Sequence, residues 1–346
     1  MTLVIRPSVE GDDAARDAFV RECDRATFFH LAGWRRAVEG VFGHQGRDLL
    51  AWRDGQVVGV LPLMACRGMR GRKSLISVPY SVYGGPVGED SKVELALYEV
   101  AERAAVSENV GRLELRCSGP TELPGSVPCD LYATFVRELP GTVDEVLSGM
   151  PKKARADARK ARKDYGLELA AGNWYLPDLV RLFQHNKRSL GTPALPLAWF
   201  ERLVHELPGQ VEVHVVMRES VPLAACMSFL FRDQVLAYYS GTGPDVDRQF
   251  KASAFLYLSL QEWCVEQGYR VFDFGRSRKD SGAFDFKRRQ GFEPRDLPYR
   301  FRLVHDKGLP SLTPSNPKTR FLTNTWQRLP EGLARGMGGY LSRYLV

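Results

Sequence analysis

The sequence lacks any apolar run that approaches the ~20 residues needed to span a membrane as a helix. Its N-terminal segment turns acidic at Glu10, Asp12 and Asp13, which is unlike a secretory signal. We therefore expect a protein that stays in the cytoplasm.

Metal-binding and redox patterns of cysteine are also missing. No C-x-x-C pair occurs, and no histidine stands at metal-ligand spacing from any of the six cysteines. In a chain of this length, that pattern predicts reduced, mostly buried thiols and no metal site. The G-x-G-x-x-G fingerprint of dinucleotide-binding folds is absent as well.

What the sequence does contain is enough material for two domains and an excess of positive charge. Its 346 residues exceed one ordinary core, and the 44% hydrophobic content is typical of globular proteins. The formal net charge is +7. This excess favours an anionic partner such as nucleic acid, a nucleotide, a phospholipid head group or a phosphorylated substrate.

An internal repeat organises the chain. Trp34 and Trp199 stand 165 residues apart, each before a pattern of alternating apolar residues, and Gly85 and Gly243 stand 158 apart, each before a proline. Each copy predicts a helix, two strands around a turn, a strand ending in the Gly-Pro loop, a second helix and a closing strand. The turns are expected at Asp54-Gly55 and at Arg232-Asp233, and Gly268 is expected to end the second helix of the second copy.

The repeat predicts an α/β fold in which each domain has a mixed, mainly antiparallel sheet flanked by helices. We expect an N-terminal domain at 1–148, a C-terminal domain at 149–306 and a basic amphipathic extension at 307–346.

Several landmarks occur in a consistent order along these two copies. They are FFHLAGWRRAV (28–38), GVLPL (59–63), VPYSVYGGP (78–86), LAYYSGTG (236–243), FDFGRS (272–277) and FKRRQGF (286–292). In this order the sequence resembles the FemAB-like proteins, whose fold is two tandem domains of the N-acetyltransferase (GNAT) type. It looks most like members from exopolysaccharide and exosortase gene neighbourhoods. The helical-hairpin arm of some peptidoglycan-bridge enzymes has no counterpart here.

The resemblance implies a catalytic role for Lys287, which follows Phe286 as in the Phe-Lys motif of that family. A cation at this point would stabilise the negative charge that develops on the carbonyl oxygen during acyl transfer. Phe286 would hold the lysine stem against an apolar wall near the substrate. The alternative is an exposed loop lysine beside Arg288 and Arg289.

Asp273 and Arg276 stand in the preceding strand and turn. Strand alternation puts Asp273 on the face opposite to Phe272 and Phe274, where its carboxylate would act as a general base or pair with a nearby arginine. Arg276 would bind a phosphate or carboxylate of the substrate in a bidentate manner.

Three further residues match acceptor-contacting positions of the family. These are Tyr239, Arg188 and, in the first domain, Arg36. An ordinary surface or packing role is the alternative for each of them and for Arg276. Either Tyr238 or Tyr239 is expected to point into a cleft if the other packs.

The acyl donor is left open between acyl-coenzyme A and aminoacyl-tRNA. GNAT enzymes that use coenzyme A cradle its diphosphate on a glycine-rich loop at a helix N-terminus. The corresponding RQFKASA segment (248–254) keeps a cation at Arg248, but Lys251 and Ser253 replace the glycines. Lys251 would then neutralise a donor phosphate directly. Fem-type enzymes take aminoacyl groups from charged tRNA.

Two basic segments add possible partners. Segment 151–166 is a helix of alanines and cations that is either a solvated linker or a surface for an RNA backbone, a nucleotide diphosphate or anionic lipid. Segment 317–346 is basic and amphipathic, and it either packs on its own chain or makes peripheral contact with a membrane.

Together these features predict an acyltransferase that moves an aminoacyl or acyl group to an amine or hydroxyl of a cell-envelope or exopolysaccharide precursor, nucleotide- or lipid-linked. Direct attack by the acceptor is expected. Two alternatives remain: a non-catalytic tandem module that binds a nucleotide-sugar or lipid-linked precursor, and an RNA-binding module that uses 151–166.

Overall fold

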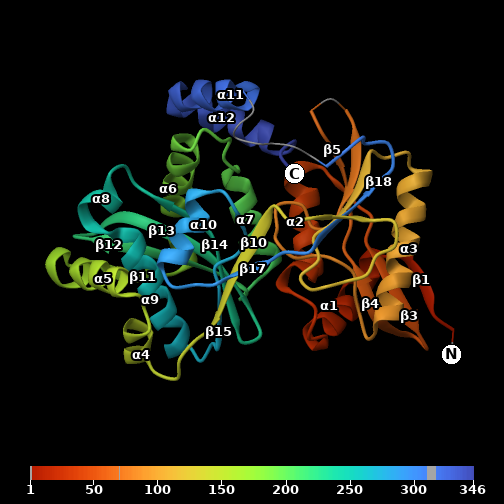
Figure 1. Ribbon diagram of the computed structural model, residues 1–346, viewed down its shortest axis with the longest axis horizontal. Coiled ribbons are helices and arrows are strands. Elements are labelled where there is room, and N and C mark those ends of the chain that lie inside the picture. Colours follow the sequence, from red (N-terminus) through yellow and green to blue (C-terminus); the bar gives the residue numbers. More distant parts are fainter. Residues whose placement is uncertain (1, 70, 310–316) are drawn as a thin grey trace. The chain divides into compact units, whose positions relative to one another are not determined.

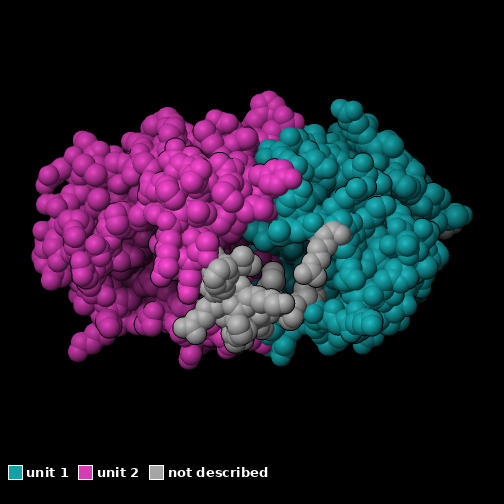
Figure 2. All heavy atoms as spheres, turned by 90° about the horizontal axis from the view of Figure 1, so that it is seen from above, with its two compact units in different colours: residues 1–132, 296–311, 343–346 teal, residues 133–295, 312–342 magenta. Residues whose placement is uncertain are grey.

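The computed structural model describes residues 2–69, 71–309 and 317–346. It divides into two compact units, drawn in different colours in Figure 2. Unit 1 comprises residues 1–132, 296–311 and 343–346, and unit 2 comprises 133–295 and 312–342.

Unit 1 contains two small sheets and three α-helices (Figure 1). The helices are α1 (Asp13–Glu22), α2 (Ala32–Phe42) and α3 (Ser91–Ser107). One sheet has the order β1 (Val4–Pro7), β3 (Leu49–Arg53), β4 (Gln56–Leu61), β7 (Val87–Gly88). The other has the order β2 (Gln45–Gly46), β5 (Met64–Arg67), β6 (Lys73–Ile76), β8 (Arg112–Leu115), β18 (Tyr299–Leu303), β9 (Val127–Cys129). Buried α3 residues at helical spacing, including Val93, Leu97 and Ala101, join both sheets in one core.

Unit 2 is built on an eight-stranded sheet. Its order is β11 (Glu168–Ala171), β12 (Val211–Arg218), β13 (Val221–Phe231), β14 (Gln234–Thr242), β15 (Val271–Asp273), β10 (Tyr132–Glu138), β16 (Ser277–Arg278), with β17 (Pro294–Asp296) also paired to β10. The β14–β15 pair is parallel, whereas the pairs on either side of it are antiparallel. The predicted mixed, mainly antiparallel sheet is therefore confirmed.

Nine α-helices accompany this sheet in the described part of unit 2. They are α4 (Val143–Ser148), α5 (Lys152–Tyr165), α6 (Leu176–Ser189), α7 (Leu197–Glu206), α8 (Val246–Phe250), α9 (Ala252–Glu266), α10 (Gly282–Arg289), α11 (Pro317–Arg328) and α12 (Glu331–Ser342). Helix α9 is buried almost all round, because it lies between the sheet and the pair α4–α5. Helix α5 turns Ala154, Ala158 and Ala161 towards α9 and leaves most of its cations exposed.

Strand pairing crosses the expected domain limits. Strand β10 lies within the range 1–148 but pairs with β15 in the sheet of unit 2, and β18 lies within 149–306 but pairs with β8 and β9 in unit 1. The compact units change at 132/133, 295/296, 311/312 and 342/343, and the domain limits expected at 148/149 and 306/307 stay a prediction. The limits of the compact units depend on pairing between strands that are far apart in the sequence. Such pairing cannot be read from local composition.

One turn of the repeat was assigned wrongly. Asp54-Gly55 joins β3 to β4 as predicted, and the matching pair in unit 2 is β12–β13. The turn equivalent to Asp54-Gly55 is therefore Glu219-Ser220, whereas Arg232-Asp233 joins β13 to β14.

Helices α11 and α12 of the C-terminal extension belong to unit 2, where they pack against α6 (Figure 1). Trp326 is buried there, and the backbone carbonyl of Leu329 accepts a hydrogen bond from Arg188 Nε at 2.8 Å. None of the described helices is long and apolar enough to cross a membrane.

Candidate functional site at the ends of strands β14 and β15

The site begins where two parallel strands part. Strands β14 and β15 pair only over three residues each, from Gln234 opposite Val271 to Leu236 opposite Asp273. Strand β15 then ends, while β14 continues to Thr242. The β13–β14 register shifts at Tyr238, so β14 carries a bulge just beyond the parting point. Bulges bend a strand and often lie beside functional sites.

Asp273 fixes the turn that follows β15. Its carboxylate has no exposed surface and accepts hydrogen bonds from Gly275 N at 2.7 Å, Gln234 Nε2 at 3.0 Å and Thr134 Oγ1 at 3.3 Å. Gly275 has φ +68°, a conformation that favours glycine. This geometry gives Asp273 a positioning role, and the expectation that it acts as a general base stays a prediction.

Lys287 holds the same turn from the other side. It lies on α10, is buried, and donates from Nζ to the carbonyl oxygens of Phe274 at 2.6 Å, Gly275 at 2.9 Å and Arg276 at 3.3 Å. The alternative of an exposed loop lysine is therefore wrong. Three carbonyl acceptors match the three hydrogens of the ammonium group.

Opposing effects act on the charge of Lys287. Burial lowers its pKa to about 7, and the neighbouring Arg276 lowers it as well, whereas the carboxylate of Asp273 raises it. The three carbonyl oxygens also favour the ammonium form. The rings of Phe135 and Phe274 have their centres 5.5 and 5.4 Å from Nζ, so the lysine is enclosed by aromatic faces.

A third cation, Lys187 on α6, lies near this turn and was missed in the sequence. Burial lowers the pKa of Lys187, and the positive charge of Arg276 lowers it further. Arg276 also lowers the pKa of Lys287, so its guanidinium interacts electrostatically with both lysines. Lys187 Nζ lies 5.3 Å from the ring centre of Phe183, one helical turn earlier. That Phe-Lys spacing of four was the one signal available in the sequence.

Aromatic side chains line the space between the parted strands. Tyr257 on α9 donates from its hydroxyl to Ser240 Oγ on β14 at 2.9 Å, and its ring centre lies 4.3 Å from that of Phe274. Phe286 is half-buried, with its ring centre 5.7 Å from Tyr257. The expected apolar wall beside Lys287 is thus present. Tyr257 and Ser240 were not singled out, because each reads as an ordinary core or strand residue.

Tyr239 packs in the core instead of facing this space. It is buried, accepts a hydrogen bond from Trp199 Nε1 at 3.1 Å, and has Phe183 and Phe200 as ring neighbours. The half-buried Tyr238 lies next to Gly275. The packing alternative therefore describes Tyr239.

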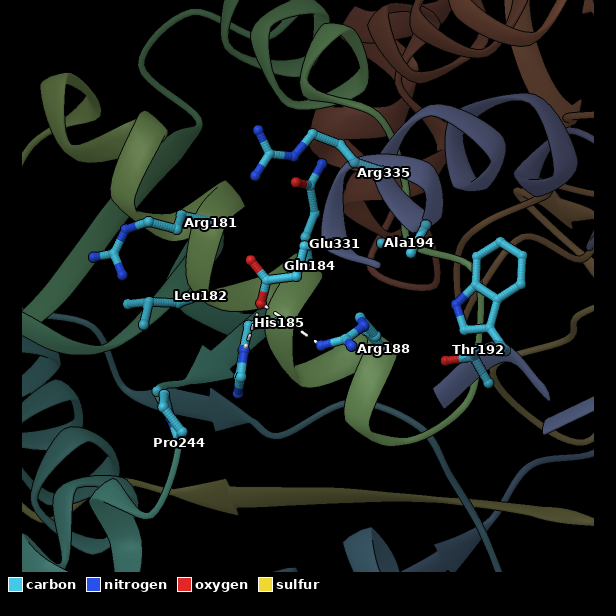
Figure 3. A pocket seen from close by; sticks show the side chains of 13 residues that line it. Arg181, Leu182, Gln184, His185, Arg188, Thr192, Ala194, Pro244, Glu331 and Arg335 are labelled. Carbon is cyan, nitrogen blue, oxygen red and sulfur yellow. Dashed lines mark ion pairs between the residues drawn. The ribbon is translucent and has the colours of Figure 1, made fainter. Parts of the chain in front are cut away.

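Arg188 faces a separate cavity of about 300 Å³ (Figure 3). Glu331 lies between His185 and Arg188, with carboxylate distances of 3.5 and 3.7 Å to His185 Nδ1 and Arg188 Nη1. Arg181 and Arg335 also line this cavity, so three arginines and one glutamate are among its thirteen lining residues.

Arg36 is placed in unit 1. It lies on α2 and forms an ion pair with Asp13 of α1. The structure therefore gives it a helix–helix contact within that unit, and its expected contact with an acceptor stays a prediction.

The start of α9, where a donor phosphate was expected, is occupied by a carboxylate of the chain itself. Asp247 accepts hydrogen bonds from Ser253 N and Ser253 Oγ, both at 2.7 Å. Lys251 adopts φ +58°, the backbone conformation of the glycine that it replaces. Arg248 is exposed and pairs with Asp245 at 3.3 Å. A diphosphate at this helix start would have to displace Asp247.

Residues 149–288 match the family model of the acetyltransferase (GNAT) domain. This segment of the chain is similar to GNAT acetyltransferase domains. No curated protein sequence matches the chain significantly.

Among solved structures, FemX has a TM-score of 0.69 at 14% identity and covers 88% of this chain and 98% of its own. L-PGS from Bacillus licheniformis has a TM-score of 0.53 at 15% identity, with 92% and 98% covered. A tandem GNAT protein from the clavulanic acid biosynthesis pathway has a TM-score of 0.50 at 13% identity, with 87% and 98% covered. At these identities the likeness concerns the fold, and it confirms two tandem GNAT-like domains.

Proposed function

We propose that this protein transfers an acyl or aminoacyl group to an amine or hydroxyl of a cell-envelope or exopolysaccharide precursor. The observation that carries the proposal is the turn 274–276 at the parting of β14 and β15. It is held by Asp273 and Lys287, it contains Arg276, and it lies in the segment that matches the acetyltransferase domain.

In the proposed reaction, the acceptor nitrogen or oxygen attacks the acyl carbon directly, and the bond from that carbon to the donor breaks. The donor oxygen or sulfur leaves with the electron pair and takes up the proton that the acceptor loses, either directly or through water. Negative charge on the carbonyl oxygen is stabilised by Arg276 and Lys187, which present cations at this turn. A thiol intermediate is disfavoured, because burial raises the pKa of the nearby Cys226 to about 12.

Lys287 is assigned to the turn rather than to the substrate. Its three hydrogens are directed at carbonyl oxygens, so it acts on the reaction through the position of Arg276 and through its charge. This refines the expectation that Lys287 contacts the reacting atoms.

Aminoacyl-tRNA fits this chain better as donor than acyl-coenzyme A. Asp247 places negative charge where the coenzyme A diphosphate would bind, and it already uses the amide of Ser253. The exposed cations of α5 offer a surface for an RNA backbone. On the acceptor side, the cationic cavity beside Arg188 suits a phosphate of a nucleotide- or lipid-linked precursor.

A second candidate function is a non-catalytic module that binds such a precursor. The complete use of the Lys287 ammonium by the backbone, and of the α9 start by Asp247, favours this alternative.

The test is a transfer assay with labelled aminoacyl-tRNA and acyl-coenzyme A, using acceptors identified by mass spectrometry of ligands that co-purify with the protein. We expect Arg276→Met to lower transfer by about 100-fold, as loss of an oxyanion-stabilising group does. Arg288→Met, at an exposed arginine of α10, is the matched control and should leave transfer unchanged. Precursor binding without transfer from either donor would support the non-catalytic module instead.

A further inference from the structure

Helix α12 is placed on unit 2 with its small residues inward. Ala334, Gly338 and Ser342, spaced by four, are buried. A Cβ atom at Gly338 would lie 3.2 Å from the carbonyl oxygen of Ala194, and one at Gly339 would lie 3.2 Å from Pro196. The backbone of α12 therefore approaches the 194–196 segment too closely for larger side chains on this face.

The large apolar residues of α12 point outward as a result. Leu333 is 57% exposed, Met337 46% and Tyr340 59%, at a spacing of four and then three residues. This spacing places them along one side of the helix. We call Leu333, Met337 and Tyr340 the α12 stripe.

Two further exposed apolar side chains lie in the segment that packs against this helix pair. Leu190 and Leu197 are exposed at the two ends of the segment that runs beneath α11 and α12. Gly191 approaches Thr323 of α11 and Pro196 approaches Gly339 of α12, which ties that segment to both helices. Five of the thirteen large apolar side chains found exposed among the described residues thus belong to this one region. Such a concentration marks an interaction surface.

The helix pair is fixed in this orientation. Gln327 Nε2 donates to the carbonyl oxygen of Ser189 at 2.8 Å, Arg188 binds the carbonyl oxygen of Leu329, and Trp326 is buried. Rotation of α12 to bury its stripe would break its close contact with 194–196. The stripe is therefore a permanent outer surface.

Charge indicates what covers the stripe. Residues 317–342 carry four cations, Lys318, Arg320, Arg328 and Arg335, against one acid, Glu331. Arg328 and Arg335 are exposed, whereas Glu331 lies against His185 and Arg188. In a symmetric contact between two copies, this cationic region would face itself. An apolar stripe with a tyrosine, on a helix pair with an excess of positive charge, instead matches an interfacial helix on anionic lipid.

We propose that the α12 stripe docks this protein on an anionic lipid surface, with Leu333, Met337 and Tyr340 inserted among the acyl chains and Arg328 at the head groups. This surface is independent of the acyl-transfer chemistry proposed above.

Co-flotation of the full chain with phosphatidylcholine vesicles, with and without phosphatidylglycerol, tests the proposal. We expect binding to the phosphatidylglycerol vesicles that weakens with added salt. The variant Leu333→Ser, Met337→Ser and Tyr340→Ser should reduce the partition coefficient by about tenfold or more. The matched control, Trp174→Ser with Val221→Ser, removes exposed apolar side chains elsewhere on unit 2 and should bind like the wild type.

Three outcomes would overturn the proposal. One is the absence of binding to phosphatidylglycerol vesicles at low salt, and another is equal binding by the stripe variant and the wild type. The third is a wild-type dimer that the stripe variant converts to a monomer, since the stripe would then be a contact between copies. Equal thermal unfolding of the variants and the wild type checks that the fold is kept.

Discussion

Replacing Lys287 by methionine probes the central turn directly. Methionine keeps an unbranched apolar stem between Phe135 and Phe274 but leaves the carbonyl oxygens of residues 274–276 without their donor. Each charge-assisted hydrogen bond contributes about 1.5–3 kcal/mol. Desolvation of the buried ammonium, which lowers the pKa of Lys287, offsets part of this contribution. We therefore expect a net loss of about 2 kcal/mol in the free energy of unfolding of unit 2.

The same substitution should change the pH dependence of stability. Because the pKa of Lys287 is lower in the native state, the native protein releases this proton first as the pH rises above about 7. Between that pH and the ordinary lysine value the unfolded chain holds more protons, so stability rises with pH, by at most about 1.4 kcal/mol per pH unit. The Lys287→Met variant should lack this rise.

Hydrogen exchange in urea measures the effect within each unit. Amides of residues 271–278 report on the turn in unit 2, and those of 112–117 in unit 1 serve as an internal reference. Arg288→Met, on the same helix but exposed, is the control. Parallel pH curves for wild type and Lys287→Met, or unchanged protection at 271–278, would refute the role assigned to Lys287. A loss of stability without any change in kcat of the folded protein would restrict that role to the fold.

Three other substitutions test the remaining parts of the site. Asp273→Ala should destabilise unit 2 by about 2 kcal/mol, because Gly275 N, Gln234 and Thr134 lose their acceptor, and urea unfolding measures this. Asp247→Ala should strengthen binding of coenzyme A several-fold by freeing the start of α9, as measured by calorimetry; no change would mean that this helix is not a donor site. Reversing exposed cations of α5, as in Lys160→Glu, should weaken tRNA binding and reduce its salt dependence, whereas unaltered binding would exclude α5 as the RNA surface.

Local patterns in the sequence were sufficient to predict the repeat and the end of helix α9. The offset between Trp34 and Trp199 identified the repeat, and Gly268, at φ +82° just after α9, ends that helix as predicted. The helix end depends on residues within one turn of Gly268, and the repeat depends on the same order of local patterns in both copies.

The environment of the site residues could not be predicted in this way. Alternation correctly separates Asp273 from Phe272 and Phe274, but all three are buried, because β15 is an inner strand covered on both faces. Lys287 stands in a run of cations that reads as solvent-exposed, and its burial arises from carbonyl groups more than ten residues earlier. The acceptors of that lysine are backbone atoms, which no side-chain pattern reveals.

The pairing of β10 in unit 2 and of β18 in unit 1 limits where this chain can be divided. The segment that matches the acetyltransferase domain, 149–288, omits β10, although β10 lies between β15 and β16 and supplies Thr134 and Phe135 to the site. In a fragment of 149–288, β15 and β16 would lose the strand that lies between them. A fragment of 1–148 would lack β18, which lies between β8 and β9. Neither fragment holds all the strands of its own sheet, so a chain divided at 148/149 would leave both sheets incomplete.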